Sequence, residues 1–192
     1  MLLEEIMIKR ILSVVALLVL STTLSAQALL VDLSPVSGDV NGYPGSTVGW
    51  GYTATNDSLI DWILLTASDF SPLPSWGAYQ DFIPVNFVLL APAGNPGDSW
   101  TESFNVLTQT GVGSFLIDSL ANPGDTATGN ISISFDRYDG DPTIGGNYLG
   151  TGTAQASASV TVDAVPEPST FFLLGGGLAG LLWVRRKSRS VV

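Results

Sequence analysis

Short stretches of alternating apolar and polar residues recur through the middle of the chain. Residues 153–162 place Ala or Val at every second position, with Thr, Gln or Ser between them, and residues 47–54 and 130–135 repeat the pattern with larger side chains. An alternation with period two is typical of a β-strand that buries one face and exposes the other. The pattern therefore predicts at least three half-buried strands.

Largely apolar runs supply further candidate strands. Residues 60–66, 87–91 and 113–117 suit strands that are buried on both sides. A weaker alternating face around Trp100 is interrupted by Glu102. The middle of the chain has no convincing pattern of an amphipathic helix, so we expect an all-β domain.

Three Pro-Gly pairs directly precede predicted strands. They are Pro44-Gly45, Pro96-Gly97 and Pro123-Gly124. Proline fixes φ at the second position of a turn and glycine accepts a positive φ at the third, so each pair predicts a type II turn. Seven to nine strands joined by such corners predict a single antiparallel β-sandwich of immunoglobulin-like architecture, which spans residues 29–165.

The N-terminus has the parts of a secretory signal peptide: a basic pair, an apolar run and small residues before a cleavage site. These parts are Lys9-Arg10, residues 11–20, and Ala26, Gln27 and Ala28. We therefore predict that residues 1–28 are a signal peptide cut after Ala28. Translation from Met7 would remove two acidic residues that are unusual in such a segment.

The C-terminus, residues 166–192, has a second tripartite pattern. It consists of Pro166-Glu167-Pro168, an apolar span at residues 171–184, and the basic residues Arg185, Arg186, Lys187 and Arg189. A helix of this span would be about 21 Å long at roughly 1.5 Å per residue, short of a hydrocarbon core of ~30 Å. The basic residues nevertheless favour a transmembrane helix, because cations behind an apolar run stop translocation and stay on the cytoplasmic side.

These C-terminal residues resemble the PEP-CTERM sorting signal of exported bacterial proteins, also catalogued as the ice-binding protein C-terminal domain. The resemblance implies recognition of Pro166, Glu167 and Pro168 by an exosortase, a membrane-embedded protease-transpeptidase. It also implies a transient inner-membrane intermediate, removal of the tail, and delivery to the envelope or exterior of a Gram-negative bacterium.

Composition excludes several kinds of site. The chain has no His and no Cys, so a Ser-His-Asp triad, a Cys-His nucleophile and a thiolate or imidazole zinc site are all ruled out. Residues 29–165 hold fourteen acidic side chains and a single cation, Arg137, within a whole-chain net charge of −10. Such a domain repels polyanions, so we expect no binding to nucleic acid.

Two clusters are candidate ligand sites. Asp136, Asp139 and Asp141 surround a glycine turn after residues 130–135 and could supply oxygen ligands to calcium, although a solvated loop, in which Asp and Gly satisfy the turn geometry, is the favoured explanation. Trp76 lies in a proline-containing loop and could stack on a sugar ring, or fold back onto the sandwich. Trp50 and Trp100 are expected to face the core.

Together, these patterns predict a non-enzymatic exported protein with a structural or adhesive role linked to exopolysaccharide, as in a biofilm matrix. Its expected partners are the general secretion machinery, an exosortase, and exopolysaccharide or matrix proteins. No cofactor is expected, with calcium left open. The alternatives are a secreted carbohydrate- or calcium-binding module and a carboxylate-dependent glycoside hydrolase, the latter disfavoured because the middle lacks cations that could orient a substrate.

Overall fold

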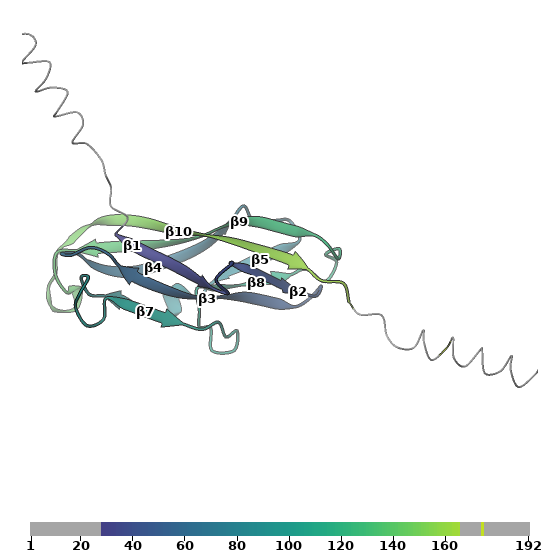
Figure 1. Ribbon diagram of the computed structural model, residues 1–192, viewed down its shortest axis with the longest axis horizontal. Helices are drawn as coiled ribbons and strands as arrows, with labels where there is room; N and C mark the ends of the chain where they lie inside the picture. The colour runs from purple at the N-terminus through teal and green to yellow at the C-terminus, as the bar shows by residue number, and fades with distance from the viewer. Residues whose placement is uncertain (1–27, 166–173, 175–192) are drawn as a thin grey trace, which may run out of the picture.

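The computed structural model describes residues 28–165 and residue 174. Ten strands and two short 3-10 turns make up this part of the chain (Figure 1). The strands are β1 (Leu29–Ser34), β2 (Asp39–Gly42), β3 (Thr47–Asn56), β4 (Trp62–Ser71), β5 (Gly77–Asp81), β6 (Leu89–Leu90), β7 (Ser99–Glu102), β8 (Gly113–Ile117), β9 (Thr126–Tyr138) and β10 (Tyr148–Val162). The 3-10 turns are η1 (Ile83–Val85) and η2 (Pro142–Ile144).

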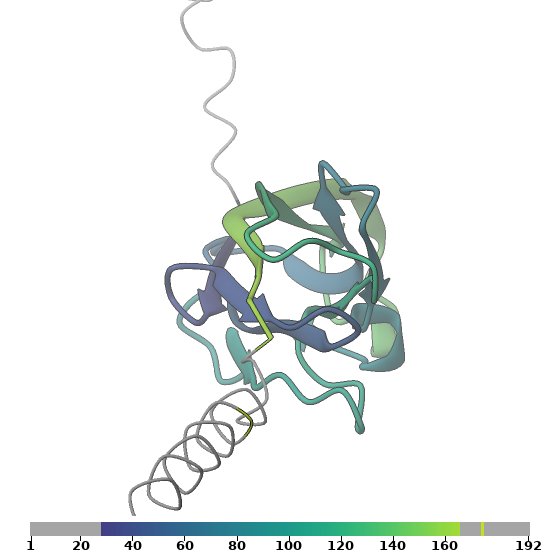
Figure 2. The same ribbon diagram turned by 90° about the vertical axis from the view of Figure 1, so that its right-hand side faces the viewer.

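The strands form two five-stranded sheets that pack face to face (Figure 2). The first sheet has the order β1-β3-β8-β5, with β7 also paired to β3, and the second has the order β2-β10-β9-β4-β6. All pairs are antiparallel except β2 and β10, which run parallel. This arrangement confirms the predicted immunoglobulin-like sandwich, with ten strands in the described residues instead of seven to nine.

The alternating stretches form β3, β9 and β10, as predicted. On β9, for example, Ile131, Ile133 and Phe135 are buried while the residues between them face outward. Of the largely apolar runs, residues 113–117 form β8, which is buried at every position except Leu116, whereas residues 60–66 and 87–91 differ from the expectation of strands buried on both sides. β4 begins only at Trp62 and alternates between buried and partly buried positions, and Ile60 is 76% exposed in the preceding loop. The prediction fails for residues 60–66 and 87–91 because an apolar residue can lie in a loop or on an outer face without a pattern that reveals it.

All three Pro-Gly pairs form the predicted corners. Gly45, Gly97 and Gly124 have φ values of +80°, +90° and +93°. In each turn the amide after the glycine donates to the carbonyl before the proline, over 2.9 Å, 3.2 Å and 3.0 Å respectively. The turns are therefore closed by the hydrogen bond that a four-residue β-turn uses.

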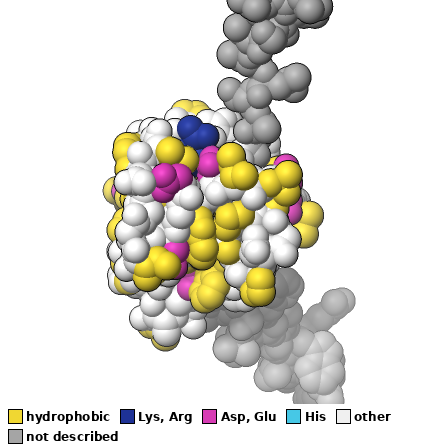
Figure 3. Space-filling view, turned by 90° about the vertical axis from the view of Figure 1, so that its left-hand side faces the viewer, with side chains coloured by type: hydrophobic (Ala, Val, Ile, Leu, Met, Phe, Trp, Pro, Cys, Tyr) yellow, Lys and Arg dark blue, Asp and Glu magenta, His cyan; other side chains and the backbone are white. Residues whose placement is uncertain are grey.

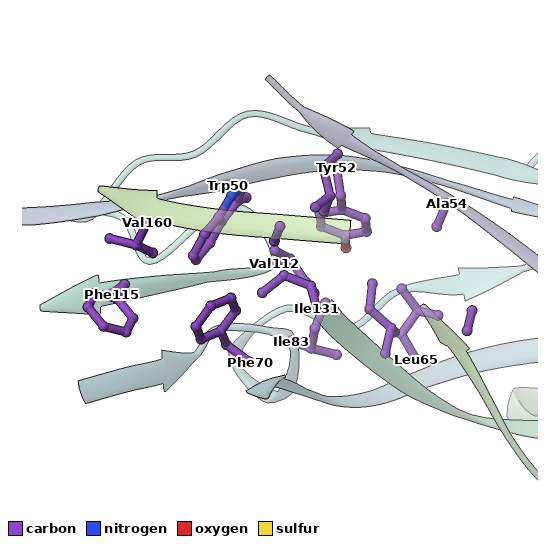
Figure 4. Packing of buried hydrophobic residues seen from close by; sticks show 14 of the residues in the cluster. Trp50, Tyr52, Ala54, Leu65, Phe70, Ile83, Val112, Phe115, Ile131 and Val160 are labelled. Carbon is purple, nitrogen blue, oxygen red and sulfur yellow. The ribbon is translucent and has the colours of Figure 1, made fainter. Parts of the chain in front are cut away.

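The core joins the two sheets through stacked aromatic rings (Figure 4). Trp50 of β3 stacks on Phe70 of β4 with ring centroids 5.7 Å apart, and Phe70 meets the ring of Phe115 of β8 edge-on at 5.8 Å. The buried Nε1 of Trp50 donates a 2.7 Å hydrogen bond to the carbonyl of Gly38, so the indole carries no unpaired polar atom into the core. Both sheets and their core are complete within residues 28–165, so we expect this stretch to fold on its own.

Apart from Ala28 and Leu174, the two terminal segments predicted from the sequence lie outside the described residues, and so does the rest of the transmembrane helix predicted at residues 171–184. Within the part that the structure describes, no helix is long and apolar enough to cross a membrane. Strand β1 begins at Leu29, directly after the predicted signal cleavage position. The carbonyl of Ala28 accepts a 2.9 Å hydrogen bond from the amide of Asp57.

Candidate functional site

The three aspartates of the predicted calcium loop have separate roles. Asp136 lies within β9, which continues to Tyr138, and not in a loop as the sequence suggested. Asp139 accepts two hydrogen bonds from Asn147, one from its backbone amide at 2.6 Å and one from its side chain at 2.9 Å. These two bonds lower the pKa of Asp139. Asp141 caps η2 by accepting from the backbone amide and the hydroxyl of Thr143 at 2.8 Å and 2.7 Å.

The structure therefore does not bring Asp136, Asp139 and Asp141 together around one point. Among the described residues, no group of three or more acidic side chains is arranged so that it could hold a metal ion. The carboxylates of Asp139 and Asp141 instead close the turn between β9 and β10, a role that Asp and Asn side chains commonly take.

Trp76, the sequence-derived candidate for sugar stacking, is only partly exposed. Its ring packs edge-on against Phe115 with centroids 5.6 Å apart, and it belongs to the partly buried residues around the core.

The prediction that Trp100 faces the core is wrong, because this side chain is 47% exposed on β7. Strand β7 pairs with β3 on the margin of the first sheet, so burial there depends on what packs over it and not on alternation alone.

A different aromatic group lies on the outer face of the second sheet. Trp62, Tyr138 and Tyr148 are directly opposite one another on β4, β9 and β10. The two tyrosine rings meet edge-on with centroids 5.8 Å apart, and Tyr148 is 58% exposed. Asp136, two residues before Tyr138, is on the same outer face and lies opposite Thr151. We call Trp62, Tyr138 and Tyr148 the aromatic cluster.

The rest of this outer face carries hydroxyl and amide groups. On β9 and β10, every outward position beyond Asp136 and Tyr148 is Ser, Thr, Asn or Gln, and each is exposed or partly exposed. These residues are Thr126, Thr128, Asn130, Ser132, Ser134, Thr151, Thr153, Gln155, Ser157, Ser159 and Thr161. We call them the hydroxyl face.

Arg137 is the only Lys or Arg within residues 28–165, and it is engaged in an ion pair. Its guanidinium lies 3.4 Å from the carboxylate of Asp61, which belongs to the loop between β3 and β4. The side chains around the aromatic cluster therefore present carboxylates without a free cation beside them. Figure 3 looks at the end of the sandwich where β9 ends and β10 begins. It shows hydrophobic side chains gathered between acidic ones, with the single cationic side chain at the upper edge.

Glu102 is the acidic residue with the most unusual surroundings. It lies opposite Tyr52 on β7 and β3, and the Oε2 atom of Glu102 and the hydroxyl of Tyr52 are both buried without a hydrogen-bond partner. Burial raises the pKa of Glu102, while a hydrogen bond from the backbone of Gly111 opposes the change. Burial and the neighbouring Glu102 together raise the pKa of Tyr52 above its usual range.

The raised pKa of Glu102 gives a prediction about stability and pH. Because the folded state holds the proton of Glu102 more tightly than the unfolded state, ionisation of this group costs stability as pH rises above the unfolded pKa. We expect Glu102→Gln to raise the melting temperature at pH 7, and this gain to vanish near pH 4. Asp32→Asn, which removes an exposed charge from β1, serves as the control for net charge. Thermal unfolding followed by circular dichroism tests this, and a gain that is equal at both pH values would contradict it.

The described residues thus define a single-domain β-sandwich protein with an acidic surface. Residues 164–187 match the family model described as PEP-CTERM protein-sorting motif, so the chain carries this sorting motif at its C-terminus. The motif indicates an exported protein that an exosortase processes, destined for the cell envelope or the extracellular space. Pro166, Glu167 and Pro168, which the sequence predicts to be the recognition residues, fall within the matched range and lie outside the described residues.

Comparison with curated protein sequences finds no significant match. Among solved structures, the chain is similar to PapD-like domain 7 of human CEP192, with 9% identity, a TM-score of 0.32, and coverage of 75% of this chain and 92% of that one. It is also similar to AggA, the major subunit of aggregative adherence fimbriae type I from Escherichia coli, with 9% identity, a TM-score of 0.28, and coverage of 70% and 93%. A third similar structure is AvmM, which catalyses macrocyclisation in alchivemycin A biosynthesis, with 14% identity, a TM-score of 0.27, and coverage of 73% and 92%.

Proposed function

We propose that the exported domain is a non-enzymatic structural or adhesive component of the envelope or extracellular matrix of a Gram-negative bacterium, where it contacts exopolysaccharide. The sorting motif supports the destination, because its bearer is exported and processed. The contact with polysaccharide is our inference from the surface of the domain.

The observation that carries this proposal is the hydroxyl face. Ser and Thr hydroxyls and Asn and Gln amides both donate and accept hydrogen bonds, as sugar hydroxyls do. Along β9 and β10 these groups repeat at every second residue, which spaces them by about 7 Å along each strand. An extended polysaccharide can therefore make many individually weak contacts with this face, and repeated weak contacts add up to useful adhesion.

Calorimetric titration of residues 29–165 with exopolysaccharide purified from the source organism tests the proposal. We expect saturable binding that weakens roughly fivefold when Thr153 and Ser157 are both replaced by Ala, because two hydrogen-bonding side chains are lost. A matched control is the double replacement of Thr47 and Thr101, exposed threonines of the first sheet, by Ala. An absence of binding by the unchanged domain would refute the proposal.

A further inference from the structure

The aromatic cluster lies at one end of the second sheet, next to the hydroxyl face. Trp62, Tyr138 and Tyr148 form a continuous row across three neighbouring strands, because each is the direct cross-strand partner of the next. Cross-strand partners have their Cβ atoms about 5 Å apart on the same face of a sheet. The outward side chains of Leu64 and Leu89, paired on β4 and β6, extend this apolar area toward the sheet edge.

An apolar row of this kind is unusual beside so many hydroxyl residues. It cannot be explained by core packing, since the inward positions of the same strands already fill the core with Ile63, Phe135 and Ala154. A sugar ring has an apolar face of C–H groups and a polar rim, and an aromatic side chain matches the apolar face. The arrangement of an aromatic row beside hydroxyl groups therefore fits a sugar chain better than a wholly apolar partner.

The charges around the aromatic cluster indicate which charge a bound sugar would carry. Asp136 is on the same face as the row, and Asp139 directly follows Tyr138 at the chain turn. The only cation of the described domain, Arg137, is occupied by Asp61. An acidic polysaccharide would be repelled by this surface, whereas an ammonium group would be attracted to the carboxylates and to the faces of the aromatic rings.

The cluster is also well placed for contact with an external polymer. It lies where β9 ends and β10 begins, at the end of the sandwich opposite to Val162, the last residue of β10 (Figure 1). Fourteen residue steps along a strand span roughly 45 Å. A domain held through its C-terminal tail would therefore present the cluster at its far end.

We propose that Trp62, Tyr138, Tyr148 and Asp136 form a contact site for a glycan whose sugars carry free amino groups. This inference rests on the proposed function, since it names the site and the class of polysaccharide. In this site the tyrosine and tryptophan rings contact the sugar faces, and the carboxylate of Asp136 pairs with an ammonium group.

The test compares three oligosaccharides by calorimetric titration of residues 29–165. The probes are a β-1,4-linked glucosamine hexamer, the N-acetylglucosamine hexamer of the same linkage, and a hexamer of a uronic acid. We expect binding to the glucosamine hexamer, at least tenfold weaker binding to the acetylated hexamer, and no binding to the uronate. Acetylation removes the charge but retains the sugar ring, so this pair isolates the contribution of the ammonium group.

Matched variants locate the binding. Tyr148→Ala is expected to weaken binding of the glucosamine hexamer about tenfold. Tyr43→Ala should leave it unchanged, because Tyr43 is 46% exposed but follows β2 at the opposite end of the sandwich. Asp136→Asn should reduce the preference for the unacetylated hexamer, whereas Asp32→Asn, on the other sheet, should not. All four positions are at least partly exposed, and an unchanged circular dichroism spectrum verifies that each variant is folded.

The outcomes separate this inference from the proposed function. If Tyr148→Ala and Tyr43→Ala bind the glucosamine hexamer equally well, the site is wrong. If the unchanged domain binds the glucosamine and N-acetylglucosamine hexamers with equal affinity, the ligand class is wrong. Neither result contradicts adhesion to exopolysaccharide. Binding to purified exopolysaccharide without any binding to the glucosamine hexamer overturns the inference in the same way. If the domain binds neither the exopolysaccharide nor any hexamer, both proposals fail.

Discussion

Replacing Asn56 by Ala is expected to lower the free energy of unfolding by about 3 kcal/mol, because it leaves three buried or partly buried backbone groups without partners. Asn56 ends β3 and is only 1% exposed. Its amide nitrogen donates to the carbonyls of Asp61 and Ala91 at 2.7 Å and 2.8 Å, and its side-chain oxygen accepts from the amide of Ser58 at 2.9 Å. One side chain thus ties the end of β3 to the β3–β4 loop and to the segment after β6.

Asn41→Ala is the matched control for this prediction. Asn41 also uses its amide nitrogen, donating to Asp163 over 2.6 Å, but this bond is exposed, so its loss should cost under about 0.5 kcal/mol. Urea unfolding of residues 29–165 measures both values. Similar losses for the two variants would show that burial of the Asn56 contacts contributes little.

Replacing Pro166, Glu167 and Pro168 together by Ala is expected to abolish processing of the C-terminus. These residues lie in the matched sorting motif, and we expect the exosortase to recognise the motif through them. In a strain with an active exosortase, we expect the variant to accumulate at its unprocessed mass in the membrane fraction. Intact-mass spectrometry of cell fractions and medium measures the result.

Deletion of residues 166–192 is the control for this experiment. Without the tail there is nothing for the exosortase to act on, so the domain should appear in the medium at its mature size. Normal processing of the triple-alanine variant would show that recognition does not depend on the Pro-Glu-Pro sequence. Persistence of the unprocessed natural chain in the same strain would contradict the role of the tail altogether.

Local sequence signals predicted the parts of the fold that depend on local geometry. Alternation located β3, β9 and β10, because a strand with one buried face must place its side chains with period two. Pro-Gly pairs located three corners, because both residues restrict φ independently of the rest of the chain. These features depend on neighbours in sequence, so one sequence is enough to read them.

Features set by pairing between distant residues were predicted poorly. Trp100 fits an alternating pattern yet is exposed, since β7 lies at the margin of its sheet. The aspartates of the predicted calcium loop are close in sequence, but β9 extends through Asp136, and the turn engages the other two. The aromatic cluster was missed for the same reason, because only the strand register places Trp62 opposite Tyr138, 76 positions further along the chain.

The position of β10 determines how the domain responds to tension. This strand lies between β9 and β2 in its sheet, and it leads directly to the C-terminal segment that carries the sorting motif. A pull on that segment acts along β10, whereas the hydrogen bonds of an antiparallel pair lie nearly perpendicular to the strand. These bonds are therefore loaded in shear and share the force, so a pull on the C-terminal end of β10 does not break them one after another.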